Sequence, residues 1–303
     1  MKRQIMALAA IAALGLSACG SDEESTDTTA PAANTTEAPS SDTTAADGQT
    51  AAACAEGTTL TAGALTIATG DPAFPPYVVD DAPESGEGFE AALALAVARE
   101  MGFEGAAVTW VRTSFDTAVA GSDSNFDFNL QQFSITPERA EVVSFSAPYY
   151  TANQAVLGYA DGAGASITSL SDLKGLKLGA AAGTTSLEFV LDVVQPDVEP
   201  FAFNSNADAK TALDNGQIDA IITDLPTGLY ISAVEIEGTK VYGQFSINAG
   251  GAGDEWGLLF TKDNPLVECA NIALATLTES GELAQITEQW MGEYTEAPYL
   301  SED

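Results

Sequence analysis

The sequence predicts an α/β fold made of two lobes. The chain has 303 residues, of which 46% are hydrophobic, and this length is enough for two lobes of roughly 100–150 residues, each with its own core. Short apolar runs typical of strands alternate along the chain with longer helical patterns, as in α/β proteins whose strands pair mostly in parallel. No segment repeats at a fixed period, so a solenoid is not expected.

The elements of the first half begin at residue 65. The clearest helix is at 89–101, because apolar side chains recur there at four-residue steps from Phe89 to Met101 and Gly102 follows them. The other expected elements are strands at 65–68, 108–111 and 126–135, a helix at 114–120, and a helix that starts at Thr136 and Pro137.

The second half continues the alternation of strands and helices. Glycines follow two of its helical patterns, at Gly216 and Gly281, and mark their ends. The expected elements are strands at 176–180 and 218–223, and helices at 185–194, 206–215, 265–280 and a last one through Trp290.

The composition excludes several classes of function. The chain has 10 Lys and Arg against 44 Asp and Glu, a net charge of −34, which repels phosphate backbones and argues against nucleic-acid binding. There is no histidine and there are only three cysteines. Any histidine-dependent catalytic triad is therefore excluded and a Cys/His zinc site is close to excluded, and we expect neither a metal nor a cofactor.

The N-terminus predicts an exported, lipid-anchored protein. Lys2 and Arg3 precede an uncharged, mostly apolar run at 5–16, which has the length of a signal-peptide core and is too short to span a bilayer. The run ends in a Leu-Ser-Ala-Cys motif at Cys19, which resembles the lipobox of bacterial lipoproteins. Residues 1–18 are then a signal peptide and Cys19 is acylated; the alternative is an ordinary secretory signal with a chance cysteine.

Residues 19–53 predict a disordered tether. From Gly20 to Ala53 there is no Val, Ile, Leu, Met, Phe, Trp or Tyr, so the segment cannot bury enough apolar area to offset its ordering entropy. Its many Ser and Thr residues leave O-glycosylation open. The folded part is expected to start near Cys54.

Seven short motifs, taken in order, indicate a family. They are Phe74-Pro75-Pro76-Tyr77, Gly88-Phe89-Glu90, Ser134-Ile135-Thr136-Pro137-Glu138-Arg139, Phe145-Ser146-Ala147-Pro148-Tyr149-Tyr150, Asp172-Leu173-Lys174-Gly175, Gly183-Thr184-Thr185 and Ile218-Asp219-Ala220. Their order and spacing over about 60–292 resemble the family 3 extracellular solute-binding proteins of amino-acid ABC transporters. The sequence departs from the family pattern at Ala92, where a second Asp is usual, and at Asn129, Gln131 and Gln132, where the strand is usually apolar and small.

The resemblance implies a two-lobed periplasmic-binding-protein-like (type II) fold. Two crossing strands form its hinge, and the ligand cleft lies between the lobes. Residues 54–151 and 255–303 would form the first lobe, and 152–254 the second lobe with the hinge strands.

The resemblance also assigns the two charges that hold an amino acid. Arg139 would bind the ligand carboxylate, which suits a bidentate guanidinium, and Asp224, at the end of a strand, would accept from the ligand ammonium. The alternatives are a surface Arg139 paired with Glu138 or Glu141, and a helix-capping Asp224. Thr185 would add a hydroxyl and a backbone N–H for the carboxylate, or serve only as an N-cap.

The remaining candidates shape the pocket. Phe74 and Phe115 match positions whose rings sandwich the ligand side chain, with core packing as the alternative for each. Ser134 should point into the cleft, and Asp71 lies near the pocket rim or is only a turn residue. Gln131 and Gln132 face opposite sides of a strand, so at most one should enter the pocket; we favour Gln132 because it shares its strand face with Ser134.

Two cysteines remain once Cys19 is lipidated. An even pair outside the cytoplasm tends to be oxidised, so we expect a Cys54–Cys269 disulfide. It would join the start of the fold to the C-terminal helix.

The predicted function is binding without chemistry. The protein would be a monomeric, extracytoplasmic component of an ABC importer, held by a lipid anchor at the outer face of the bacterial cell membrane. It would capture a polar or charged α-amino acid and deliver it to a permease. The alternatives are a cyclohexadienyl-dehydratase-like enzyme acting on small carboxylic acids on the same scaffold, and a ligand-sensing domain.

Overall fold

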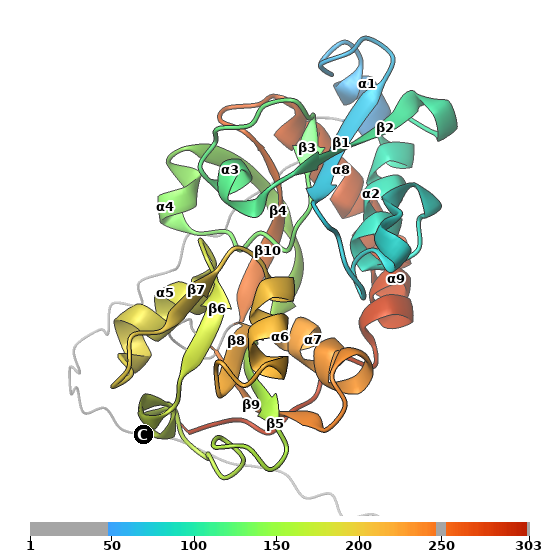
Figure 1. The fold of residues 1–303 in the computed structure, drawn as a ribbon. Coiled ribbons are helices and arrows are strands. Elements are labelled where there is room, and N and C mark those ends of the chain that lie inside the picture. The colour runs from blue at the N-terminus through green and yellow to red at the C-terminus, as the bar shows by residue number, and fades with distance from the viewer. Residues whose placement is uncertain (1–47, 247–252, 302–303) are drawn as a thin grey trace, which may run out of the picture. The chain divides into compact units, whose positions relative to one another are not determined.

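The computed structural model describes residues 48–246 and 253–301. All of them belong to one compact unit, Ala45–Asp303. The predicted signal peptide, Cys19 and most of the predicted tether lie outside the described residues. The described chain forms two five-stranded sheets, and each is the centre of one lobe (Figure 1).

The first sheet has the strand order β2-β1-β3-β10-β4. Its strands are β1 (Leu65–Gly70), β2 (Val108–Thr113), β3 (Phe128–Asn129), β4 (Val143–Ala152) and β10 (Asp254–Thr261). The helices of this lobe are α1 (Ala51–Ala55), α2 (Phe89–Glu100), α3 (Phe115–Val119), α4 (Pro137–Ala140), α8 (Leu266–Glu279) and α9 (Glu282–Met291), with 3-10 turns at Val79–Asp81, Pro83–Ser85 and Gly105–Ala107.

The second sheet has the strand order β7-β6-β8-β5-β9. Its strands are β5 (Gln154–Tyr159), β6 (Leu178–Ala181), β7 (Phe201–Phe203), β8 (Ala220–Asp224) and β9 (Thr239–Phe245). The helices are α5 (Thr185–Phe189), α6 (Asn206–Asp214) and α7 (Leu225–Tyr230), with a 3-10 turn at Ser171–Gly175 and π-helical turns at Val190–Val194 and Ile231–Glu235.

Both sheets are mixed, which corrects the expectation of mostly parallel pairing. The βα units pair in parallel, as β1 does with β2 and β3, and β6 with β7 and β8. The strands that carry the chain between the lobes, β4, β5, β9 and β10, all pair antiparallel. The two-lobed α/β fold with crossing strands is confirmed.

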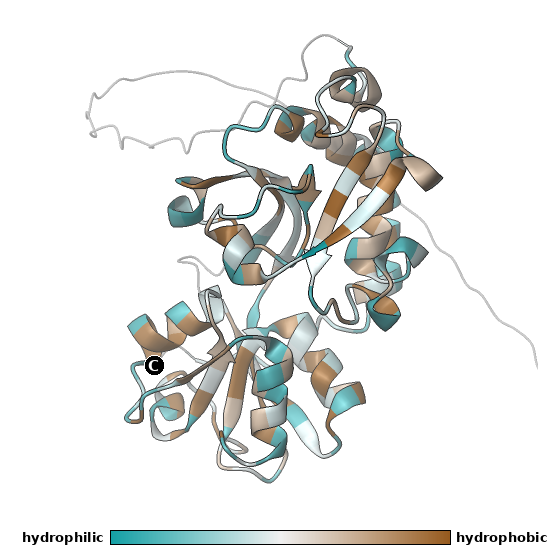
Figure 2. Cartoon of the chain, turned by 45° about the horizontal axis from the view of Figure 1, so that its top comes forward, coloured by the Kyte–Doolittle hydropathy of each residue, from teal (hydrophilic) through white to brown (hydrophobic). Residues whose placement is uncertain are grey.

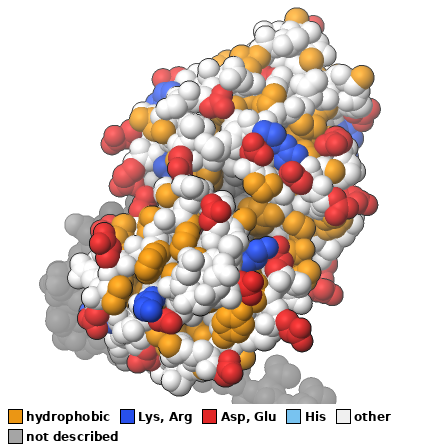
Figure 3. All heavy atoms as spheres, in the orientation of Figure 1, with side chains coloured by type: hydrophobic (Ala, Val, Ile, Leu, Met, Phe, Trp, Pro, Cys, Tyr) orange, Lys and Arg blue, Asp and Glu red, His pale blue; other side chains and the backbone are white. Residues whose placement is uncertain are grey.

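Each lobe buries its own apolar side chains. Hydrophobic residues, in brown, concentrate on the strands and on the helix faces that cover them (Figure 2). Helix α2 shows the cause: its first residue Phe89 and the following Leu93 and Val97 are fully buried, and Gly102 just beyond it has φ +86°, which ends the helix. Acidic side chains are scattered over the surface of both lobes (Figure 3), as the net charge of −34 requires.

Strand β3 is much shorter than the strand expected at 126–135. It covers only Phe128–Asn129, and Gln132 lies in the left-handed region at φ +51°, which a strand cannot accommodate. The backbone therefore leaves the sheet and turns along the cleft before α4.

Within the part of the chain that the structure describes, connections between the lobes are seen at three places. Strand β4 leads through Asn153 directly into β5, and the chain returns from β9 to β10 through a segment that lies partly outside the described residues. The C-terminal segment is the third connection: Tyr299 and Ser301 form β-bridges with Gln244 and Ser169 of the second lobe. The expectation that 255–303 belongs entirely to the first lobe is therefore wrong at its end, where Leu300 packs into the second core.

The expected disulfide between Cys54 and Cys269 is confirmed, with a Cα–Cα distance of 5.3 Å. It joins α1 to α8. Helix α1 begins at Ala51, with the Thr50 hydroxyl as its N-cap, so ordered structure starts inside the range assigned to the tether.

None of the helices in the described ranges is both long enough and apolar enough to cross a membrane.

Candidate functional site

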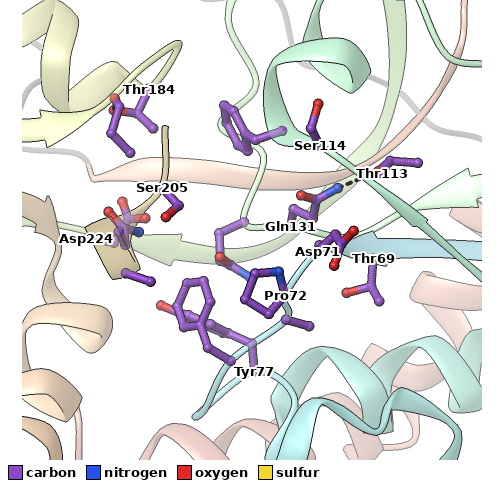
Figure 4. Close-up of a pocket in the computed structure, with 18 of the residues that line it drawn as sticks. Thr69, Asp71, Pro72, Tyr77, Thr113, Ser114, Gln131, Thr184, Ser205 and Asp224 are labelled. Carbon is purple, nitrogen blue, oxygen red and sulfur yellow. Dashed lines mark hydrogen bonds between the residues drawn. The ribbon is translucent and has the colours of Figure 1, made fainter. Parts of the chain in front are cut away.

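A pocket opens between the lobes and is lined from both of them (Figure 4). All eight binding residues expected from the sequence line it: Asp71, Phe74, Phe115, Gln132, Ser134, Arg139, Thr185 and Asp224. In Figure 4, Asp224 and Thr184 lie on one side, and Asp71, Gln131 and Ser114 on the other.

Arg139 is held in the pocket by carbonyl groups of both lobes. It lies in the first turn of α4, which the Thr136 hydroxyl caps, and only 8% of its surface is exposed. Its Nη1 donates to the Ser134 carbonyl at 2.8 Å and its Nη2 to the Gly183 carbonyl at 3.0 Å. The guanidinium lies 5.5 Å from the centre of the Phe115 ring. Arg139 is thus not the surface residue of the alternative interpretation, and burial lowers its pKa.

Asp224 lies at the junction of β8 and α7. Its backbone is at the N-cap position of α7, but its side chain makes no capping bond; it accepts from Gln154 Nε2 at 2.6 Å instead. Burial raises the pKa of the Asp224 carboxyl to about 8, and the charge of Asp254 contributes to this shift. A buried carboxyl of this kind can accept from a ligand ammonium, and the cation would favour its ionised form.

Thr185 and Ser134 face each other across the cleft. Their hydroxyl oxygens are 3.4 Å apart, and both hydroxyls bond the same carboxylate oxygen of Asp254, at 2.8 and 3.2 Å. The N-cap of α5 is Thr184, whose hydroxyl accepts from Leu187 N. The simple capping role considered for Thr185 is therefore wrong.

The two aromatic candidates both line the pocket and also pack on neighbouring rings. Phe74 meets Tyr77 edge to face at 5.6 Å between ring centres. Phe115 stacks on the buried Phe133 at 5.1 Å. Core packing and a place in the pocket are therefore compatible for both residues.

Gln131 and Gln132 both line the pocket, which contradicts the expectation that at most one would. The alternation of a strand does not apply, because β3 ends at Asn129. Gln131 donates to Thr113 Oγ1 at 2.8 Å and to Asn129 Oδ1 at 3.0 Å. Gln132 donates its backbone N–H and its Nε2 to Glu90 at 2.8 and 2.5 Å.

Glu90 and Tyr77 are pocket residues that the sequence analysis missed. Glu90 also accepts from the Tyr149 hydroxyl, and burial raises its carboxyl pKa to about 7. The Tyr77 hydroxyl is 2.8 Å from Thr227 Oγ1 of α7 and so links the lobes. Both residues lie in motifs that carried the family resemblance, Gly-Phe-Glu and Phe-Pro-Pro-Tyr, and this was the signal available.

Residues 65–293 match the model of the bacterial extracellular solute-binding proteins, family 3. The chain belongs to this family. The match covers both lobes and leaves out the N-terminal segment.

Similar family members include the arginine-binding periplasmic protein of Mannheimia haemolytica, which is 31% identical over 241 residues, 78% of this chain and 95% of that protein. The ABC transporter arginine-binding protein 1 of Escherichia coli is 29% identical over 72% of this chain and 86% of its own length. A solved structure of an ancestral arginine-binding protein bound to arginine is 32% identical and covers 76% of this chain and 99% of its own, with a TM-score of 0.65.

These relatives are substrate-binding proteins of amino-acid transport. The chain is accordingly an extracytoplasmic solute-binding protein and not an enzyme. An ancestral amino-acid-binding protein described as a precursor of cyclohexadienyl dehydratase is also similar, with 29% identity over 75% of this chain and 95% of its own and a TM-score of 0.63. That structure is itself named as an amino-acid-binding protein, so it does not support the dehydratase alternative.

Proposed function

We propose that this solute-binding protein captures arginine between its lobes and delivers it to an ABC importer. The observation that carries the proposal is the charge of the pocket, whose lining contains the carboxyls of Asp71, Glu90 and Asp224 together with the guanidinium of Arg139. A neutral α-amino acid would use Arg139 and Asp224 and leave the other carboxyls without a cation. A cationic side chain matches the remaining negative charge, and the arginine-binding relatives support the same choice.

The ligand would contact both lobes at once. Arg139 of the first lobe would hold its carboxylate, and Asp224 of the second its ammonium. The rings of Phe74 and Phe115 would flank the side chain, where an aromatic face also attracts a guanidinium. Because these contacts are complete only when the lobes are closed, the ligand favours the closed state by its differential affinity.

Calorimetric titration against the twenty amino acids tests this assignment. Arginine should bind most tightly, and citrulline, its neutral isostere, should bind at least about tenfold more weakly because the pocket carboxyls that face the ligand side chain would lose their cation. Asp71→Asn should weaken arginine binding more than glutamine binding. Equal affinity of the wild-type protein for arginine and citrulline would refute a cationic ligand while leaving amino-acid binding intact.

The proposal extends to the N-terminus, outside the described residues. Acylated Cys19 would hold the monomeric protein at the outer face of the membrane, and the Ser/Thr-rich tether would let the folded part reach its permease.

A further inference from the structure

Asp254 is the centre of a buried polar cluster behind the pocket. It is the first residue of β10, where this strand leaves the hinge, and 4% of its surface is exposed. One carboxylate oxygen, Oδ2, accepts from Thr185 Oγ1 at 2.8 Å, from Ser134 Oγ at 3.2 Å and from Gln154 Nε2 at 3.2 Å. The cluster therefore joins the first lobe, the second lobe and the hinge at one oxygen atom.

The hydroxyls of Ser134 and Thr185 both donate their hydrogens within this cluster. A hydroxyl has one hydrogen to donate and two lone pairs that accept. Ser134 and Thr185 both line the pocket, yet each donates its hydrogen to the Asp254 carboxylate. What they present to the cleft are lone pairs, which suit a ligand N–H and not a ligand carboxylate.

The orientation of Gln154 is fixed as well. Its Oε1 accepts from the Ser186 hydroxyl, so its Nε2 faces both Asp224 and Asp254, at 2.6 and 3.2 Å. The carboxyls of Asp224 and Asp254 share this one amide donor, so they lie close together. Of the two, Asp224 lines the pocket. The charge of Asp254 and the direction of the hydroxyls thus act in the same sense, in favour of a cationic group at this end of the cleft.

We propose that Asp254 is a positioning and specificity-determining residue that turns the Ser134 and Thr185 hydroxyls into acceptors and so makes the pocket require the α-ammonium of its ligand. The inference rests on the proposed function only in that the ligand is an α-amino acid; it does not depend on the side chain. It also revises the role expected for the Thr185 hydroxyl, which would serve the ammonium and not the carboxylate.

The test compares two ligands that differ only in the amine. Arginine and its desamino analogue, 5-guanidinopentanoic acid, are titrated by calorimetry into the wild type, Asp254→Ala and Asp254→Asn. In Asp254→Ala the hydroxyls are free to donate, so arginine affinity should fall by about 10- to 100-fold, as for loss of hydrogen bonds to a charged group. The affinity for the desamino acid should stay within about threefold or improve. Discrimination, the ratio of the affinity for arginine to that for the desamino acid, should therefore fall at least about tenfold.

Asp254→Asn keeps an acceptor oxygen and loses the charge, so its discrimination should lie between those of the wild type and Asp254→Ala. It is also the variant to use if Asp254→Ala does not fold. Glu255→Gln is the matched control, because Glu255 is the next residue of the same strand and is exposed. Its discrimination should equal that of the wild type.

A purely structural role for Asp254 predicts equal losses for both ligands. Discrimination within threefold of the wild type in both Asp254 variants would therefore overturn the inference. If the wild type prefers another amino acid, the same comparison is made with that amino acid and its desamino analogue. If the wild type binds no amino acid at all, the proposed function fails together with the inference, whereas amino-acid binding with unchanged discrimination refutes the inference alone.

Discussion

Arg139 is the single cation among the charged residues that line the described pocket, and it also links the lobes through the Ser134 and Gly183 carbonyls. Replacing Arg139 with Ala should weaken ligand binding by about 3–5 kcal/mol, the cost of breaking a buried charge pair, or roughly 10²–10³-fold and more in affinity. Arg139→Lys should restore only part of it, because an ammonium lacks the planar fork. Calorimetric titration measures both.

Arg99→Ala provides the control for Arg139. Arg99 pairs with Glu100 and Glu282 at the surface, and such surface ion pairs contribute little to stability. The ligand affinity of Arg99→Ala should equal that of the wild type. An Arg139→Ala protein that binds within threefold of the wild type would contradict the role of Arg139 at the carboxylate.

Asp224, as the proposed partner of the ligand ammonium, should make ligand binding dependent on pH. Its carboxyl pKa is raised to about 8 by burial in the ligand-free protein, so it is mostly protonated at pH 7. An ammonium bound to Asp224 lowers this pKa, so a proton is released on binding at pH 7 and affinity rises with pH until about 8, by at most about tenfold per pH unit.

Calorimetry at pH 7 in two buffers of different ionisation enthalpy measures this proton. The wild type should release up to one proton per ligand, and Asp224→Asn should release correspondingly less. Proton uptake by the wild type, or equal release by both proteins, would contradict the assignment of Asp224 to the ammonium.

The site residues that the sequence could predict are those that come with a motif. Arg139 follows its helix start in a recognisable segment, and Asp224 ends an apolar strand. Asp254 could not be found in this way, because its role depends on β10 placing it beside residues that precede it by 120 and 69 positions. Gln132 lines the pocket as predicted, but the expectation that Gln131 would not is wrong for a local reason: the left-handed backbone at Gln132 cancels the strand alternation on which that expectation rests.

Among the elements, the disulfide between α1 and α8 is the strongest constraint. It closes a loop of 215 positions, and loop entropy sets an upper limit of about 5 kcal/mol on its contribution to stability. A protein with both Cys54 and Cys269 replaced by Ser should unfold at lower denaturant concentration, by up to this amount. Its ligand affinity should change little, because neither cysteine lines the pocket.

Intact-mass measurement of the exported protein is the companion experiment. It should show two hydrogens fewer before reduction than after. Free thiols at both positions in the unreduced protein, or a double variant as stable as the wild type, would speak against a stabilising disulfide.

The elements that sequence patterns identified best are those with local signals. Helix α2 has its apolar periodicity and a terminating glycine, and β1 and β2 are compact apolar runs. Sequence patterns do not predict the antiparallel pairing of β4, β5, β9 and β10, since that pairing is decided by where the hinge takes the chain. The alternation of strands and helices along the sequence therefore cannot predict that both sheets are mixed.

At the scale of the whole molecule, the lipid attachment that we propose at Cys19 would decide where the protein works. Cells labelled with a clickable fatty acid should incorporate it into the wild type and not into Cys19→Ala, and only the wild type should remain in the membrane fraction after a salt wash. Equal labelling of the two proteins would contradict acylation at Cys19.

The two ends of the described chain are carried by different lobes. Helix α1 is linked by the disulfide to the first lobe, and residues Tyr299 and Ser301 are bridged to the second. A donor dye near Thr50 and an acceptor dye near Ser301 would therefore be attached to different lobes, on opposite sides of the hinge. Energy transfer between two such terminal labels should change with each capture of ligand, so the chain could be made into an optical sensor without a label placed near the pocket.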